Sequence, residues 1–258
     1  MDRDLKYILV GNGRWGGRMH ALLVGENRRS NFLPDARRKP DETDIKYTSR
    51  ISDALERSTS QIAWLCVPPG PHVPPLIHAA LAANLHVVVE KPWVYSQEQT
   101  AALQRTAGQK GLSIGVHFEY CFLSEVQSWR RIYETEAGLQ FGGIFTVSAR
   151  DRLGIPALQN LGSHLMAIHA YAAPRSVVTG IQCGYESPDH RSIWLDSGDR
   201  RVATVDFFNT KEPIIQRFLT QFESSMGEKP FPLNLDFALR IKEELVALDE
   251  EVPPEKRP

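Results

Sequence analysis

The sequence is poor in cysteine and has no long apolar run. Its three cysteines, Cys66, Cys121 and Cys183, lie far apart, so we expect no disulfide framework, no zinc site and no other metal centre. No apolar run approaches the ~18 residues typical of a membrane span, and the amino terminus has no apolar signal segment. These absences predict a reduced, cytoplasmic protein that binds no membrane.

Neither sign of charge is in excess. Lys and Arg number 30 and Asp and Glu number 31, which leaves a formal net charge of -1. This balance provides no general attraction to nucleic acid, so we expect none as a partner. Hydrophobic residues make up 42% of the 258 residues, enough to fill one large core or two small ones.

Strand-like and helix-like patterns alternate over residues 1–120. Ser96 and Gln99 predict a capping box that opens one of the helices. Strands alternating with helices of this length indicate an N-terminal Rossmann domain over residues 1–120, built on a doubly wound parallel sheet. The strand-like segments are 5–10, 62–67, 86–89 and 112–118.

Residues 121–258 have a different character, with several strands and few helices between them. Ser124 with Gln127 predicts one capped helix, and two further helices close the chain after Pro213. We expect a small α+β domain over 121–258 with an open, mostly antiparallel sheet, whose closing helices can pack back on the first domain. The expected strands are 144–149, 177–183, 192–195 and 202–208.

A glycine-rich loop directly follows the first strand and opens the first helix. In this context Gly11 permits a tight turn, Gly13 lets a pyrophosphate approach the backbone, and Gly16 lets helix and strand pack closely. The alternative is an ordinary glycine-rich turn. The predicted dinucleotide loop is Gly11, Asn12, Gly13, Arg14, Trp15 and Gly16.

The choice between NAD and NADP depends on the end of the second strand. Asp35 lies 19 residues after Gly16, where an acid would bind the ribose hydroxyls of NAD. Arg37 and Arg38 follow at once and could hold the 2′-phosphate of NADP, or belong to a solvated basic loop. The cofactor is therefore NADP or NAD, with NADP slightly favoured.

Two further loops are expected at the carboxyl edge of the sheet, where open α/β folds bind their ligands. One is the proline-rich loop with Val67, Pro68, Pro69 and His72; its alternative interpretation is a polyproline ligand for an SH3-type partner. The other is Glu90-Lys91-Pro92, which follows a buried strand. A lysine placed there can donate a hydrogen bond to a substrate oxygen or transfer a proton.

These motifs, together with NLGSHLMAIHAY at 160–171 and FALRIKEELVAL at 237–248, resemble the Gfo/Idh/MocA family of glucose–fructose oxidoreductase and inositol dehydrogenase. The resemblance covers nearly the whole chain, and Glu-Lys-Pro is its most specific part. It implies a Rossmann domain followed by a domain with an open, mostly antiparallel sheet. It also implies that Lys91 contacts substrate and cofactor, and that the peptide bond before Pro92 is cis.

The second domain supplies further candidates. Asn160 and His164 are four residues apart, so they can share one face of a helix. In dehydrogenating members of the family this histidine acts as acid or base beside the lysine, oriented by an aspartate that Asn160 replaces here. His117 is a candidate substrate contact, and Tyr120 is a candidate proton donor or a tyrosine at the edge of the core.

The resemblance implies an NAD(P)-dependent oxidoreductase that passes a hydride between nicotinamide and a small molecule. The substrate would be a ketone, an imine or a hydroxyl-bearing compound, either sugar-like or a biosynthetic intermediate. The alternative is a non-catalytic or partner-dependent binding subunit that keeps the fold of the family, favoured by Asn160, by the polar second strand and by a second domain that looks short. We also expect a homo-oligomer, a dimer formed through the sheet of the second domain.

Overall fold

The computed structural model describes residues 5–148, 154–185, 188–208 and 210–251, and the chain forms two compact units. Unit 1 comprises Met1–His117 and Phe222–Leu239, and unit 2 comprises Phe118–Gln221 and Arg240–Pro258. The sequence predicts a boundary at 120/121 with closing helices that can pack back on the first domain; the structure divides the chain at 117/118 and groups a returning segment, 222–239, with the first unit.

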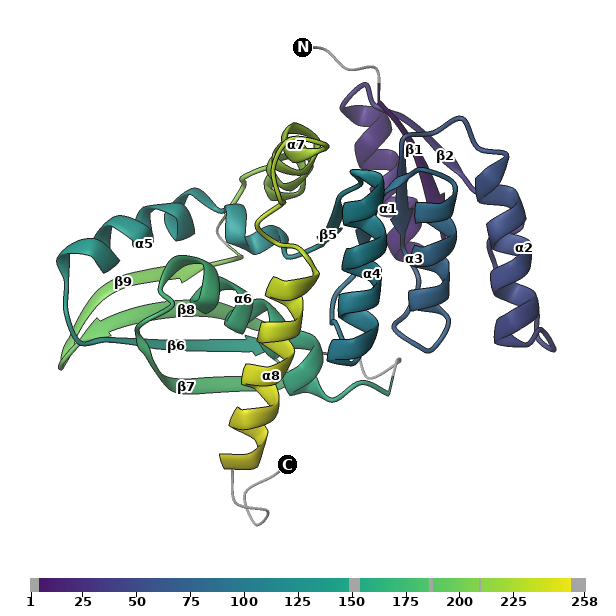
Figure 1. The fold of residues 1–258 in the computed structure, drawn as a ribbon. Helices are drawn as coiled ribbons and strands as arrows, with labels where there is room; N and C mark the ends of the chain where they lie inside the picture. The colour runs from purple at the N-terminus through teal and green to yellow at the C-terminus, as the bar shows by residue number, and fades with distance from the viewer. Residues whose placement is uncertain (1–4, 149–153, 186–187, 209, 252–258) are drawn as a thin grey trace. The chain divides into compact units, whose positions relative to one another are not determined.

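Unit 1 is built on a five-stranded parallel sheet with the strand order β2-β1-β3-β4-β5 (Figure 1). Its strands are β1 (Lys6–Val10), β2 (Arg29–Phe32), β3 (Ile62–Leu65), β4 (His86–Val89) and β5 (Ile114–Val116). Its helices are α1 (Arg14–Gly25), α2 (Asp44–Glu56), α3 (Val73–Ala82) and α4 (Gln97–Lys110). The strand order reverses between β1 and β3, and such a switch point is where doubly wound sheets bind ligands.

The local signals in unit 1 agree with the structure. The side chain of Ser96 accepts from the backbone of Gln99 and the side chain of Gln99 accepts from Ser96, so the predicted capping box of α4 is confirmed. The polar segment around Ser30 does form a strand, because β2 pairs in parallel with β1 along its whole length. Ser30 is buried there, with its hydroxyl 3.1 Å from Nδ1 of His20.

The returning segment joins unit 1 through side-chain packing. Phe222 and Phe231 cover Gly115 so closely that a Cβ there would lie 2.8 Å from one ring and 3.0 Å from the other. Glu223 accepts two hydrogen bonds from Arg28, at 2.8 and 3.0 Å, and a third from the hydroxyl of Tyr7. The segment takes in the end of α7 (Ile214–Ser225) and the start of α8 (Leu235–Glu251).

Unit 2 is built on a four-stranded sheet with the order β7-β6-β8-β9. The strands are β6 (Leu139–Thr146), β7 (Val177–Gly184), β8 (His190–Ser197) and β9 (Arg200–Asp206). β6 pairs in parallel with β7, and the other two pairings are antiparallel, so the expected mostly antiparallel sheet is confirmed. The helical elements are η1 (Glu119–Phe122), α5 (Ser124–Thr135), a π-helical turn η3 (Leu158–Gly162) and α6 (Ser163–Ala172).

The predicted cap of α5 is wrong. Ser124 is the first helical residue, and its backbone N–H donates to the carboxylate of Glu212 at 2.9 Å. Gln127 donates to the carbonyl of Cys121. A carboxylate at a helix N-terminus is favoured by the helix dipole, so an acid distant in the sequence replaces the local cap. Within the described residues, no helix is long and apolar enough to cross a membrane.

Candidate functional site

The glycine loop of unit 1 has the backbone geometry that a dinucleotide needs. Gly11 has φ +109°, and a Cβ there would lie 2.5 Å from the carbonyl oxygen of Cys66. A Cβ at Gly16 would lie 2.0 Å from the carbonyl oxygen of Gly11. Around Gly13, by contrast, a Cβ would meet no atom within 4 Å. The loop therefore excludes side chains where strand and helix meet and leaves open space beside Gly13.

The N-terminus of α1 follows this open space. Gly13 is its N-cap, no side chain caps it, and its first turn carries no acidic residue. Uncapped backbone N–H groups and the positive end of the helix dipole attract a phosphate. These residues fit a pyrophosphate, and their contact with that of NAD(P) stays a prediction.

The loop after β2 is held to α2 by one arginine. Arg50 donates to both carboxylate oxygens of Glu42, at 2.8 and 2.7 Å, and to the carbonyls of Asp35 and Arg37. These hydrogen bonds from Arg50 lower the pKa of Glu42 to about 2. Tyr47 adds a hydrogen bond to the carbonyl of Ala36 at 3.1 Å. The backbone that carries the cofactor-selecting candidates is thus fixed from α2.

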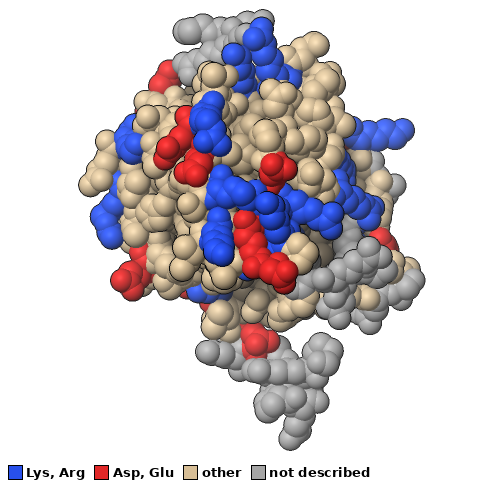
Figure 2. Space-filling model, turned by 90° about the vertical axis from the view of Figure 1, so that its right-hand side faces the viewer, with Lys and Arg blue, Asp and Glu red and all other residues tan. Residues whose placement is uncertain are grey.

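Of the two candidate arginines on this loop, Arg38 already binds other residues of the protein. It forms an ion pair with Asp44 at 2.7 Å and donates to the carbonyl of Glu42 at 2.9 Å. The side chains of Arg37 and Asp35 are exposed, and neither forms an ion pair with any described residue. Figure 2, which shows the α2 side of the molecule, displays a band of Lys and Arg side chains. Of the two arginines, Arg37 is thus the one without an ion pair among the described residues, and its contact with a 2′-phosphate stays a prediction.

Glu90, at the end of β4, lies in a buried cluster. It accepts from the indole N–H of Trp64 at 2.9 Å and lies 3.2 Å from Nδ1 of His117. Burial alone would raise the pKa of Glu90, but the adjacent His117 and the hydrogen bonds from His117 and Trp64 outweigh it and lower that pKa. His117, predicted as a substrate contact, is 1% exposed with its Nδ1 on Glu90. Its substrate role stays a prediction.

Lys91 lies between two anchored residues. Glu90 precedes it, and Trp93 beyond it is buried and donates to the hydroxyl of Thr100 at 2.9 Å. The Lys91–Pro92 peptide bond is cis, which confirms the expectation from the resemblance. Lys91 itself is half-buried. Its backbone is therefore fixed at the carboxyl edge of the sheet.

The proline-rich loop is also held at this edge. Tyr95 donates its hydroxyl to the carbonyl of Gly70 and accepts from the Gly70 N–H, both at 3.1 Å. His72 makes an edge contact with the ring of Tyr47, 5.8 Å between centroids, and burial lowers its pKa. The loop joins β3 to α3, as a connection at the cofactor edge does; the contacts predicted for Val67, Pro68, Pro69 and His72 stay predictions.

In unit 2, the structure brings His164 and Tyr120 together. The two rings meet edge to face, with centroids 4.9 Å apart, and His164 is 7% exposed. Phe145 lies against His164 at 5.4 Å, and Phe207 against Tyr120 at 4.7 Å. We call these four residues the aromatic cluster; it lies on the α6 side of the second sheet.

Asn160 lies in the π-helical turn that directly precedes α6, and the expectation that it points together with His164 stays a prediction. Its side-chain N–H donates to the hydroxyl of Tyr185 at 2.9 Å, and Tyr185 donates to the carbonyl of Ile155 at 2.8 Å. Asn160 therefore fixes the segment before α6, and its predicted substrate role stays a prediction.

Sequence reasoning missed Arg191. It lies opposite Phe145 in the β6–β8 pairing, and its guanidinium carbon is 5.3 Å from the ring centroid of Phe145. The signal was in the alternation of β8, where Arg191 shares a face with Ile193 and Leu195, both fully buried. An arginine on an apolar face is unusual and draws attention to the site.

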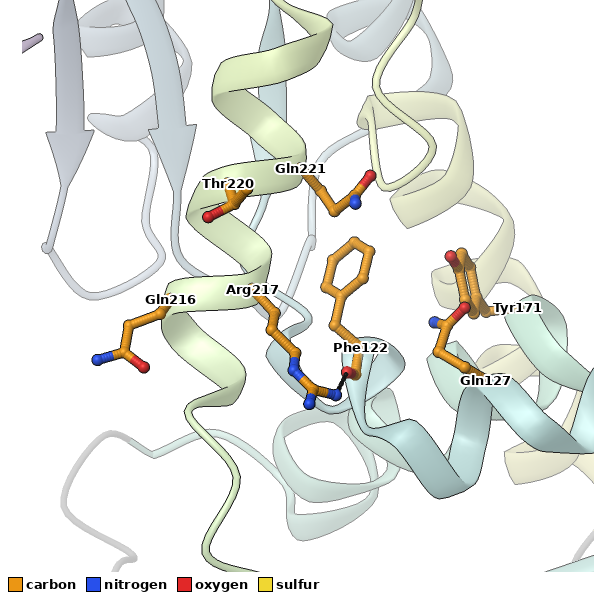
Figure 3. A pocket seen from close by; sticks show the side chains of 7 residues that line it. All are labelled: Phe122, Gln127, Tyr171, Gln216, Arg217, Thr220 and Gln221. Atoms are coloured by element: carbon orange, nitrogen blue, oxygen red, sulfur yellow. Dashed lines mark hydrogen bonds between the residues drawn. The ribbon is translucent and has the colours of Figure 1, made fainter. Parts of the chain in front are cut away.

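A separate pocket of about 360 Å³ lies between α5, α6 and α7 in unit 2 (Figure 3). The guanidinium of Arg217 is turned to the carbonyl of Phe122, at 3.3 Å, and to Glu212, at 2.8 Å. No predicted site residue lines this pocket. Among the described residues, no group of three His, Cys, Asp or Glu is placed to hold a metal ion.

Comparison with known proteins agrees with the geometry of unit 1. Residues 5–118 match the oxidoreductase family GFO_IDH_MocA, NAD-binding Rossmann fold. These residues therefore carry the NAD-binding Rossmann domain of the Gfo/Idh/MocA oxidoreductase family. A curated relative, the scyllo-inositol 2-dehydrogenase (NADP(+)) IolW of Bacillus subtilis, is 22% identical over 217 residues, 75% of this chain. The chain spans 60% of the length of that relative.

Solved structures show that the fold extends over both units. The WlbA dehydrogenase from Bordetella pertussis, in complex with NADH and UDP-GlcNAcA, has a TM-score of 0.70 and 14% identity, covering 96% of both chains. The UDP-N-acetylglucosamine 3-dehydrogenase GnnA from Acidithiobacillus ferrooxidans has a TM-score of 0.74 and 13% identity, covering 96% of this chain and 97% of its own. At such identities the likeness establishes the fold alone.

Proposed function

We propose that this chain is an NAD(P)-dependent oxidoreductase of the Gfo/Idh/MocA family. Its reaction passes a hydride between nicotinamide and a sugar-like molecule, or the ketone or imine related to one. The observation that carries the proposal is the glycine loop, which excludes side chains at Gly11 and Gly16 and stays open at Gly13. The relatives that act on inositol and on nucleotide sugars support a polyhydroxylated substrate.

In this proposal, different residues of the chain bind the cofactor, polarise the substrate and transfer the proton. The backbone of the glycine loop and the N-terminus of α1 hold the pyrophosphate. The bound nicotinamide supplies the hydride chemistry. Lys91 donates a hydrogen bond from Nζ to the reacting oxygen or nitrogen of the substrate, which polarises it. The buried Glu90 fixes the backbone from which Lys91 extends.

The proton in this proposal is supplied by His164 or Tyr120. Both carry groups that can hold and pass a proton, and they lie in contact with each other. Because Asn160 carries no charge, it cannot stabilise an imidazolium as an aspartate would. We therefore propose reduction of a ketone or imine as the favoured direction.

NADP is the cofactor that we propose. Arg37 supports this choice, because its guanidinium is exposed and its backbone carbonyl is held by Arg50. Asp35 is the competing feature, since an exposed carboxylate favours the free ribose hydroxyls of NAD.

The experiment that tests the proposal is a calorimetric titration with NADPH and NADH, followed by turnover of a panel of ketones, imines and sugar alcohols. Lys91→Ala should keep its cofactor affinity within about threefold and lose about 10²–10⁴-fold in turnover, the usual contribution of a positioned proton donor. Lys229→Ala, an exposed lysine of the same unit, is the matched control. Unchanged turnover in Lys91→Ala contradicts the assigned role.

The second candidate is a binding subunit that holds nucleotide without redox turnover. The observation that favours it is the amide of Asn160 at the position of the family's aspartate, hydrogen-bonded to Tyr185. Tight NADPH binding with no turnover of any substrate in the panel would support this candidate.

Pairing of two copies through the second sheet stays a prediction. One face of that sheet packs on η3 and α6, and on the other face Trp194 lies over Gly142 with Arg201 stacked above its ring at 4.7 Å. Sedimentation of the wild type and of Trp194→Glu tests it: a dimer that dissociates in the variant confirms the interface.

A further inference from the structure

Arg191 is a cation without an anionic partner in the part of the chain that the structure describes. Its guanidinium carbon lies 5.3 Å from the ring centroid of Phe145 and 5.2 Å from that of Phe208. Its Nε is fully buried and has no hydrogen-bond partner among the described residues. The guanidinium thus contacts the faces of two aromatic rings, and these contacts give its N–H groups no oxygen or nitrogen acceptor.

Other arginines of unit 2 show what is usual in this protein. Arg201 pairs with Asp196 at 2.7 Å, Arg217 with Glu212 at 2.8 Å, and Arg200 with Glu136 at 3.2 Å. The side chains of these three arginines are exposed to solvent, and each still forms an ion pair with a carboxylate. Burying a guanidinium donor without an acceptor costs free energy, so its retention on an apolar strand face calls for an explanation.

The place of Arg191 supplies that explanation. Phe145 contacts Arg191 at 5.3 Å and His164 at 5.4 Å, so one ring links the cation to the candidate acid–base residue. Arg191 and the aromatic cluster are all part of unit 2. A ligand that reaches His164 from this face of the sheet therefore comes close to a guanidinium that has no acceptor among the described residues.

We propose that Arg191 is the anion-binding residue of the substrate site and that the substrate carries a carboxylate or phosphate group. The inference rests on the proposed function, because it names the substrate class of that same site. A guanidinium presents a planar fork of N–H donors that matches either oxyanion with two parallel hydrogen bonds. The two phenylalanine rings exclude water from its faces, which strengthens such a pairing.

The test measures binding of two matched pairs of probes that differ in the anion. The pairs are glucuronate with glucose, for a carboxylate, and UDP with uridine, for a diphosphate. Calorimetry on NADPH-saturated protein keeps the nucleotides out of the cofactor site. We expect the wild type to bind the anion of at least one pair about tenfold or more tightly than its neutral partner.

Arg191→Met keeps the unbranched stem between the two rings and removes the charge. It should lose about 10–100-fold in affinity for the preferred anion, the size expected for a charge-assisted bidentate contact, with the neutral probe unchanged. Arg191→Lys should recover only part of the loss, since an ammonium lacks the planar fork. Arg201→Met, an arginine stacked on Trp194 in the same sheet, is the matched control and should bind like the wild type.

The outcomes separate this inference from the proposed function. The inference is supported if the wild type prefers an anionic probe and Arg191→Met loses this preference. The pair of probes that shows the preference identifies the anion as a carboxylate or a diphosphate. Equal loss in Arg201→Met, no loss in Arg191→Met, or no anion preference in the wild type overturns it. Cofactor titration is a separate measurement: if NADPH fails to bind, the proposed function fails, and the same probes on cofactor-free protein still judge Arg191.

Discussion

The two units differ in whether a buried charged group has hydrogen-bond partners. In unit 1, Glu90 is surrounded by donors from Trp64 and His117, and Glu223 is bound by Arg28 and Tyr7. In unit 2, the buried Nε of Arg191 lies among aromatic rings without an acceptor in the described residues. Paired charges fix backbone positions, whereas a charge left without a partner is available for recognition.

This difference suggests a division of labour. In the proposed function, unit 1 binds a cofactor whose shape is constant, and a fixed backbone loop suits a constant ligand. Unit 2 presents side chains on a sheet face, where one substitution changes what is recognised without disturbing the sheet. Variants in each unit test whether the division holds.

The largest effect is expected at the glycine loop. Gly16→Ala would place a Cβ 2.0 Å from the carbonyl oxygen of Gly11, so the backbone must shift at the point where the pyrophosphate binds. We expect NAD(P)H affinity to fall by more than about 100-fold, consistent with a distorted loop. Gly17→Ala is the control, because its Cβ meets nothing within 4 Å and alanine favours the helix. Calorimetry on both variants checks this, and similar affinities would show that the close packing is irrelevant.

Glu90→Gln tests the pairing of buried charge in unit 1. The amide keeps the volume and loses the charge beside His117, so we expect a loss of about 1–3 kcal/mol in the free energy of unfolding at pH 7. Because the pKa of Glu90 is lowered in the folded protein, its contribution is present above the ordinary glutamate pKa and disappears as the pH falls through the lowered value.

Urea unfolding at several pH values measures both parts of this prediction. The difference between wild type and Glu90→Gln should be constant near neutrality and should shrink below about pH 4, under the ordinary glutamate pKa. Glu56→Gln, at an exposed position of α2, is the control and should cost little at any pH. A difference that does not change with pH would mean that the charge of Glu90 is not what stabilises the folded protein.

The same contrast explains what the sequence could predict. The glycine loop and Lys91 were predicted because a tight turn and a strand end are specified by neighbouring residues. The strand at Arg29–Phe32 was doubtful from its polar sequence, since it depends on pairing with β1 rather than on its own composition. Arg191 was missed because its partner Phe145 comes from another strand, and only the pairing register brings the two together.

The wrong helix cap in unit 2 has a similar cause. Ser124 and Gln127 form a local capping pattern, but Glu212 supplies the acceptor from 88 residues away. The π-helical turn that holds Asn160 was not visible in the sequence either, and whether Asn160 and His164 point together stays a prediction. Local patterns predict local geometry, and they fail where tertiary contacts decide between close alternatives.

A smaller effect is expected at the clamp between α2 and the loop after β2. Arg50→Met removes the donors that hold the carbonyls of Asp35 and Arg37, so the loop should lose its fixed position. We expect the affinity for NADPH to fall by about 3–10-fold, which lowers the ratio of the NADH to the NADPH dissociation constant by the same factor. The affinity for NADH should change little, because the pyrophosphate loop is untouched. Arg57→Met at the end of the same helix is the control. An equal loss for both cofactors would indicate a general disturbance rather than positioning.

The smallest difference between the two units is expected in the reactivity of their cysteine thiols. Burial raises the pKa of Cys66 and Cys121 well above the usual value, and it raises the pKa of Cys183 to about 12. Since the thiolate is the reactive form, all three should react with a disulfide reagent at pH 8 far more slowly than in the urea-unfolded chain. Rapid labelling of one cysteine in the folded protein would show that its unit opens locally, and comparing Cys66 with Cys183 would reveal which unit does so more often.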